Sequence, residues 1–225
     1  MKIIALVAAA LFGQEAEYAA FVERTNAAVP PPTIESISLV ALATLQALRR
    51  QEGGCVPTGL TMDQPRTAIA TFAISQGVAS GQVRNGWTVY GRSLGCADAP
   101  PVRFMVLRMP DDQLRAIVVN DGETLANPSL MRDSSAPAAI AAYQVVRTAD
   151  AACDGSDMRM GATRVAERGA DLGDEYHGAF YSGSWSEIWT FVVCGRTVEV
   201  PITFTADGNG GAHYNIRSAE VRIVR

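Results

Sequence analysis

The sequence predicts an α+β protein of two similar lobes, each made of one helix followed by an antiparallel β-meander. The first observation is an internal repeat: a shift of 98 positions (153 − 55) superimposes all four cysteines and two of the three tryptophans. The second is that each copy opens with apolar residues at helical spacing and continues with β-branched and aromatic segments. A helix and a sheet with one apolar face each can bury those faces together. We therefore expect a tandem duplication with two lobes related by a pseudo-twofold axis.

The four cysteines favour one disulfide in each copy. Cys55 and Cys96 lie 41 residues apart (96 − 55), and Cys153 and Cys194 repeat that spacing (194 − 153). Four cysteines allow three pairings, and a duplicated internal bridge leaves equal spacings. We therefore predict the bridges Cys55–Cys96 and Cys153–Cys194, formed in an oxidising compartment. The alternative is four buried thiols in a cytosolic protein.

Residues 1–13 have the outline of a secretory signal peptide, with one lysine before a short apolar run. Ala10 and Gly13 are the candidate cleavage positions, and the alternative is an ordinary helix running to Thr25. With the disulfides, this leader predicts a periplasmic or secreted protein. Residues 14–33 are expected to form a mobile segment, moderately helical over 14–28, followed by a spacer with three consecutive prolines. No internal apolar run is long enough for a transmembrane span in the mature chain.

Composition and charge narrow the class of protein. The chain has 225 residues, of which 48% are hydrophobic, so it can bury a substantial core. Its net charge is −4, and no cluster of basic residues stands out. We therefore expect no nucleic-acid partner.

The first repeat is predicted at residues 34–119. Ser36 or Ser38 is a suitable N-cap for a helix over 36–51, and two glycines end that helix. Residues 67–76 are compatible with either a strand or a helix. Three strands follow, over residues 82–92, 102–109 and 114–119, and a proline-containing turn joins the last two.

The second repeat is predicted at residues 134–225, after a connecting loop at 120–133. Ser134 or Ser135 is the expected N-cap of a helix over 136–148, with Pro137 in its first turn. Residues 161–173 are ambiguous, and residues 178–194 are expected to form one or two strands. A clear hairpin is predicted over residues 198–216 and a last strand over residues 219–225.

No catalytic constellation is recognisable in the sequence. The chain has no Gly-x-Ser-x-Gly motif and no phosphate-binding glycine loop, and the bridges leave no cysteine as a nucleophile. Asp174, Glu175 and His177 are close in sequence, but their spacing matches no zinc pattern. The segment 207–211 begins like a calcium loop but lacks the distal glutamate. We therefore assign no catalytic, cofactor-binding or metal-binding residue and no cofactor. These observations favour a protein that is not an enzyme.

The tryptophans are the most informative large side chains. Trp87 and Trp185 occupy matching places and are expected to pack in the core over their own disulfides. Trp189 is matched by Gly91 in the first copy, so the shared core does not require it. Residues two apart on a strand share a face, so we predict Trp189 and Glu187 as a partner-binding surface.

The segment of about residues 187–211 resembles small exported proteins of Gram-negative bacteria that have no assigned activity. The resemblance rests on Glu187-Ile188-Trp189-Thr190, Cys194-Gly195, Phe204-Thr205-Ala206-Asp207 and Gly210-Gly211. It implies export and no particular chemistry. The plan of two copies with one disulfide each is similar in architecture to the β-lactamase inhibitor protein class, although no inhibitor motif is matched.

These observations predict an exported, non-catalytic protein that binds another macromolecule or the cell envelope. The alternative is an envelope hydrolase or a small-ligand-binding protein with an unrecognised site. An apolar patch on a sheet, or a groove between the lobes, favours a macromolecular partner. A deep closed pocket that holds His177 or His213 beside a carboxylate favours an enzyme.

Overall fold

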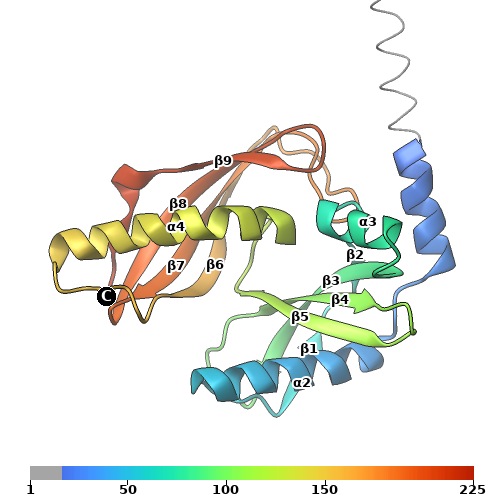
Figure 1. Cartoon of the computed structure of the whole chain (residues 1–225), viewed down its shortest axis with the longest axis horizontal. Coiled ribbons are helices and arrows are strands. Elements are labelled where there is room, and N and C mark those ends of the chain that lie inside the picture. Colours follow the sequence, from blue (N-terminus) through green and yellow to red (C-terminus); the bar gives the residue numbers. More distant parts are fainter. Residues whose placement is uncertain (1–16) are drawn as a thin grey trace, which may run out of the picture.

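The computed structural model describes residues 17–225, which form an α+β fold of two lobes (Figure 1). In each lobe one long helix packs against an antiparallel sheet, as the sequence predicts. The predicted signal peptide at residues 1–13 lies outside the described residues. Within residues 17–225, no helix is both long and apolar enough to cross a membrane.

The first lobe carries a sheet in the order β1-β3-β4-β5, and β2 extends the edge beside β1 by pairing with β3. Its helix α2 packs mainly on β5 and covers one face of the sheet. The elements are α2 (Ile34–Glu52), β1 (Gly59–Met62), β2 (Arg66–Thr67), α3 (Phe72–Ala79), β3 (Asn85–Leu94), β4 (Val102–Arg108) and β5 (Leu114–Asp121).

Helix α2 begins and ends at clear capping signals. The Thr33 side chain accepts from the Ser36 amide, so the N-cap is Thr33 and neither Ser36 nor Ser38. Gly53 ends the helix with φ +68°, a left-handed conformation that glycine adopts without strain. Ile37, Ala41 and Leu45 form its buried face against β3 and β4.

The second lobe carries a sheet in the order β6-β7-β8, with β9 and β10 both paired to β8. Helix α4 packs on β7 and β8 (Figure 1). The elements are α4 (Pro128–Ala149), β6 (Arg159–Arg168), β7 (Ser184–Val193), β8 (Arg196–Ala206), β9 (Ala212–Ile216), the 3-10 helix η1 (Ser218–Glu220) and β10 (Arg222–Ile223).

Helix α4 begins earlier than the sequence predicts, so the connecting loop expected at 120–133 is wrong for most of its length. The N-cap is Asn127, whose Oδ1 accepts two backbone N–H groups, and Pro128 occupies the first turn. Pro137 therefore lies inside the helix, where it has no N–H for the Asp133 carbonyl. The Tyr214 hydroxyl donates to that carbonyl at 3.3 Å and supplies the missing partner.

The expectation of a mobile segment at residues 14–33 is wrong for the described part of that segment. Residues 17–28 form a helix that packs on the first lobe, and Val22 is completely buried there (Figure 1, blue). The Asn26 side chain accepts hydrogen bonds from Thr67 Oγ1 and Asn85 Nδ2. The apolar side of this helix packs against Ala68 and Ile74, which are distant in sequence. Local composition could therefore not predict where the helix packs.

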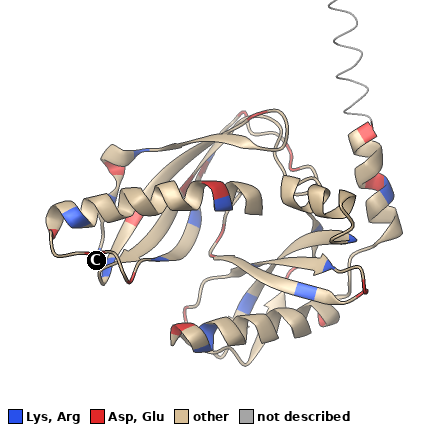
Figure 2. Ribbon diagram, viewed as in Figure 1, with Lys and Arg blue, Asp and Glu red and all other residues tan. Residues whose placement is uncertain are grey.

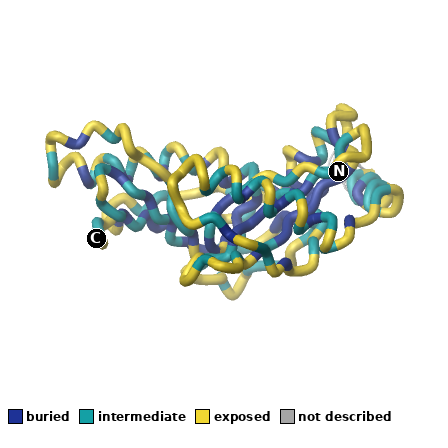
Figure 3. Tube along the Cα trace, turned by 90° about the horizontal axis from the view of Figure 1, so that it is seen from below, coloured by how far each residue is buried: buried dark blue, intermediate teal, exposed yellow. Residues whose placement is uncertain are grey.

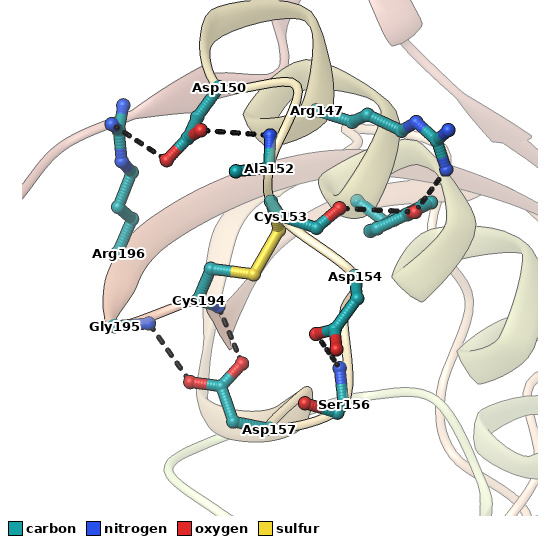
Figure 4. Close-up of a disulfide and its surroundings, with 11 residues drawn as sticks. Arg147, Asp150, Ala152, Cys153, Asp154, Ser156, Asp157, Cys194, Gly195 and Arg196 are labelled. Atoms are coloured by element: carbon teal, nitrogen blue, oxygen red, sulfur yellow. Dashed lines mark hydrogen bonds and ion pairs between the residues drawn. A yellow bond between two sulfur atoms is a disulfide. The ribbon is translucent and has the colours of Figure 1, made fainter.

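Each lobe contains one disulfide, with the pairing that the equal spacing predicts: Cys55–Cys96 and Cys153–Cys194. Cys194 and Gly195 form the two-residue turn between β7 and β8, both with positive φ (+49° and +72°). The Asp157 carboxylate accepts both of their N–H groups (Figure 4). The disulfide and this carboxylate together hold a non-glycine residue in a left-handed conformation.

Trp87 and Trp185 do not pack over their disulfides, contrary to expectation. Each lies near the start of a ten-residue strand, and the matching cysteine follows the end of that strand. At about 3.3 Å per residue, nine residues separate them by roughly 30 Å. Both indoles are nevertheless buried. Figure 3 shows that buried residues are concentrated along the middle of the trace, with exposed residues around them.

The two lobes pair their central strands in equivalent registers. Trp87 is opposite Val106 on β4, and 98 residues later (185 − 87 and 204 − 106) Trp185 is opposite Phe204 on β8. The pairing of β4 with β5 recurs at the same offset between β8 and β9. The helices differ: α2 buries Ile37, Ala41 and Leu45, whereas α4 buries Ser134, Ala138 and Ala142, at an offset of 97 (134 − 37).

Candidate functional site at the junction of the lobes

The structure contradicts the predicted partner surface at Trp189 and Glu187. Both residues are 0% exposed and lie on the face of β7 that packs against α4, together with Trp185. The shared face was correctly deduced from the strand period, but it is the core face. One sequence signal could have identified this face as the core face. Trp185 lies on it and matches Trp87 in the first copy, and both tryptophans were expected to be buried in the core.

Glu187 is a buried carboxylate that receives five hydrogen bonds and lies beside no cation within ion-pair distance in the described chain. Its Oε1 accepts from Trp185 Nε1, Leu125 N and Ala126 N at 2.8–3.0 Å. Its Oε2 accepts from Trp189 Nε1 and Thr124 Oγ1, both at 2.7 Å. These five donors replace the hydrogen bonds to water that the carboxylate loses on burial.

These bonds fix the segment that connects the lobes. Thr124, Leu125 and Ala126 lie between β5 and α4, and Glu187 holds them against β7. Just before them, Gly122 pairs with Thr163 of β6, and a Cβ at Gly122 would collide with the Thr163 backbone. A buried polar network therefore joins the lobes, and we expect them to move as one body.

The matching position in the first lobe lacks this network. Val89 occupies the place of Glu187 (187 − 98), and the buried Trp87 Nε1 has no hydrogen-bond partner within the described chain. The carboxylate is thus a feature of the second lobe alone. The carboxylate binds the connecting segment, and that segment hydrogen-bonds to the side chain at this position only in the second lobe.

A pocket of about 960 Å³ opens at the junction, and we define it as the tyrosine pocket. Five segments that are far apart in sequence form its walls: the helix over 17–28, the start of α3, the first turn of α4, the β6–β7 connection and the β8–β9 turn. Its volume is within the range of small-molecule sites. The lining residues used below are Tyr18, Phe72, Tyr176 and Tyr181, with Ser129, Arg132, Asp133, Asp174 and Asp207.

Aromatic rings dominate one side of the tyrosine pocket. Tyr176 and Tyr181 meet edge to face with centroids 6.0 Å apart, and Phe72 is 66% exposed at the rim. Burial, and next the neighbouring Tyr18 and Tyr176, raise the pKa of Tyr181 to about 12, so its hydroxyl stays protonated at neutral pH. The Tyr18 hydroxyl is the neighbouring group that can pair with Tyr181 Oη, whereas the buried Oγ of Ser129 has no hydrogen-bond partner in residues 17–225.

Acidic side chains give the tyrosine pocket a negative balance. Three aspartates line it against one arginine, Arg132, which already pairs with Asp133 at 3.0 Å. Asp207 accepts the N–H groups of Asn209 and Gly211 in the β8–β9 turn, and Asp174 is exposed. Elsewhere positive and negative residues are interspersed over both lobes (Figure 2).

Neither histidine lines this pocket. His177 Nε2 lies 3.2 Å from Glu23 Oε1, on the packed connection between β6 and β7, and His213 is exposed on β9. In the described part of the chain, no group of three or more His, Cys, Asp and Glu side chains is placed to hold a metal ion. Neither His177 nor His213 therefore lies in this pocket beside a carboxylate, which is the arrangement that would favour a histidine-based enzyme.

The fold and the site together define an α+β protein of two similarly built lobes with a ligand-sized pocket at their junction. Comparison with protein-family models, with curated proteins and with solved structures gives no match to this chain. The function is therefore argued from the site itself.

Proposed function

We propose that this protein is an exported, non-catalytic binding protein whose tyrosine pocket receives an organic cation. The observation that carries the proposal is the combination of four aromatic rings with a net negative lining in one pocket. Ring faces attract ammonium and guanidinium groups, and the attraction grows where water is excluded. A small ammonium compound and a lysine or arginine side chain of a partner protein offer the same chemistry.

Two further features support a cation rather than an anion. The three aspartates oppose negative ligands, and Asp174 has no ion-pair partner among residues 17–225. The unpartnered hydroxyl of Ser129 can bond a polar group that accompanies the cation. Apolar walls with a few convergent polar groups are typical of ligand sites.

Calorimetric titration with choline tests the proposal, with dimethylbutanol as its neutral isostere. We expect saturable binding of choline and at least fivefold weaker binding of the isostere, because cation–π contacts contribute about 1 kcal/mol. Equal affinity for both compounds would show an apolar site without cation preference. Lack of binding by either compound would remove the tyrosine pocket as the functional site.

Variants locate the binding. Phe72→Ala should weaken choline about fivefold and leave the stability nearly unchanged, because the ring is mostly exposed. Leu39→Ala is the matched control, since Leu39 is 68% exposed on α2 and far from the pocket lining. A lysine-rich peptide that competes with choline would indicate a protein partner; failure to compete, with choline bound, indicates a small molecule.

We also infer that the lobes arose by tandem duplication. The support is the recurrence of two strand-pairing registers at an offset of 98 and of the disulfide at the same offset. The helix offset of 97 requires a one-residue length change between each helix and its first cysteine. An experimental structure should superpose β3–β5 on β7–β9 with Trp87 on Trp185, and a best fit at another offset would contradict this origin.

Export is the remaining part of the proposal. Two disulfides agree with an oxidising compartment, since such bridges are rare in the cytosol. Cell fractionation with non-reducing peptide mapping tests it. Periplasmic or secreted protein with both bridges is expected, and cytosolic protein with free thiols would contradict export.

A further inference from the structure

A second cavity, of about 520 Å³, lies between the lobes on the other side of the β6–β7 connection. We define it as the arginine cleft. Its walls are the face of the first sheet that is turned away from α2, the connecting segment 123–125 and part of the segment 173–180. Asp174 lines both cavities, but the two sets of walls otherwise differ.

Arg103 is the one buried charge among the described residues that line the arginine cleft. It is 6% exposed on β4, whereas Asp63, Arg66, Arg92, Glu123, Arg168, Asp174 and Glu175 are all exposed. Its guanidinium lies 5.9 Å from the Tyr90 ring centroid, and its Nη1 donates to the Ala126 carbonyl at 2.7 Å. A guanidinium is permanently charged, so its burial is costly unless an anion compensates it.

No such anion is supplied by the described chain. No carboxylate of residues 17–225 forms an ion pair with Arg103. The nearest buried carboxylate along the network, Glu187, is reached only through the backbone of Ala126, and five donors already occupy it. The Nε of Arg103 is buried without any partner there.

The unused donors form one edge of the guanidinium. Nη1 points to Ala126, so the opposite edge, made by Nε and Nη2, is the one that no described residue satisfies. Two parallel N–H groups on one edge match the two oxygens of a carboxylate. Because Nε is not in contact with solvent, a ligand must displace the atoms that cover it.

We propose that the arginine cleft binds a small monoanion through a carboxylate on the Nε–Nη2 edge of Arg103. A single negative charge balances the single buried positive charge. The exposed rim carries four acidic residues against three arginines, which disfavours a doubly charged phosphate. This site is independent of the cation proposed for the tyrosine pocket.

NMR titration of the full chain tests the proposal, with the Arg103 Nε–H resonance as the readout. Propionate should shift this resonance saturably, while propionamide, which is neutral, should not. Inorganic phosphate should bind at least threefold more weakly than propionate. No saturable shift with propionate, or an equal shift with propionamide, would overturn the proposal, and choline serves as the control ligand for the other pocket.

Variants separate a ligand-binding role from a structural one. Arg103→Met should abolish propionate binding, and Arg103→Lys should weaken it about tenfold because the planar edge is lost. Arg92→Met is the control, an exposed arginine of the same cleft, and should change the affinity less than twofold.

Stability provides the second readout. If Arg103 is kept for a ligand, its replacement by methionine removes an uncompensated buried charge, and the ligand-free Tm should stay level or rise. A Tm more than about 4 °C below that of the wild type would show that the charge serves the structure, and the inference would fail.

Discussion

Replacement of Glu187 by valine, the residue at the matching position of the first lobe, is the sharpest test of the junction. The carboxylate holds five donors, and its removal leaves four of them without an acceptor: Trp185 Nε1, Trp189 Nε1, Leu125 N and the Thr124 hydroxyl. Ala126 N keeps a second acceptor, Thr124 Oγ1, at 3.0 Å.

The magnitude follows from that count. Each buried donor without a partner costs about 1–3 kcal/mol, or roughly 4–12 kcal/mol for four. The cost of taking the polar carboxyl group out of water, on the order of several kcal/mol, is recovered when the group is removed. We expect a net loss of about 3 kcal/mol in the free energy of unfolding, measured by urea denaturation with tryptophan fluorescence.

Glu187→Gln should cost less, about 1–3 kcal/mol, because the amide can satisfy most of the donors. Its oxygen can take the place of Oε1, and its NH₂ group then faces Thr124 Oγ1 and Trp189 Nε1. The hydroxyl can rotate to accept, whereas the indole N–H cannot, so one donor remains unpaired. Trp189→Phe removes that donor, so the double variant Glu187→Gln with Trp189→Phe should be more stable than the sum of the single changes predicts.

Three results would refute this reasoning. Glu187→Val within about 1 kcal/mol of the wild type would mean that the donors find other partners. Glu187→Gln less stable than Glu187→Val would mean that the cost of burying a polar side chain outweighs the donors that it satisfies. Simple additivity in the double variant would show that Glu187 and Trp189 are not coupled.

Trp189→Ala should destabilise the fold by about 3–5 kcal/mol in thermal melts, as much as Trp185→Ala, because both indoles are buried; a nearly unchanged Tm would restore Trp189 as a surface residue. The disulfide of the first lobe is the more exposed, so limited reduction followed by mass spectrometry should open it before that of the second lobe; the reverse order would contradict the burial. Tyr181 has a folded pKa of about 12, above the ordinary 10, so its contribution to stability is complete below pH 10 and is lost between pH 10 and 12. Tyr181→Phe should flatten the loss of stability over that range, and an unchanged slope would contradict the assignment. Gly122→Ala should destabilise the junction and speed amide exchange at Leu125, because a Cβ there meets the Thr163 backbone at a positive φ; wild-type exchange would contradict a tight junction.

Local patterns in the sequence were sufficient to predict both disulfides and most of the long strands. The spacing of the cysteines predicted both bridges, and β-branched and aromatic segments separated by turns predicted the strands that became β3, β4, β5, β7, β8 and β9. These features depend on neighbours along the chain or on an internal repeat, both of which are visible without coordinates. The predicted N-caps of the helices were less reliable. Thr33 and Asn127 are the N-caps, whereas serines later in the chain were expected. Several residue types can cap a helix, and tertiary packing selects one of them.

Two failures in prediction have a common cause. The strand period placed Glu187 and Trp189 on one face but does not say which face is covered, and α4 covers it. The helix over residues 17–28 looked like a mobile leader remnant because its partner, a patch near Ala68 and Ile74, is far along the chain.

The sequence by itself indicated two similar lobes, the disulfide pairing and, in each lobe, a helix followed by antiparallel strands. Only the tertiary structure decided the candidate sites. The tyrosine pocket draws on five distant segments, and the arginine cleft is defined by a charge whose burial no local pattern records. The physical reason is that element type follows from interactions a few residues apart, whereas burial, unpaired donors and cavities arise where remote segments meet.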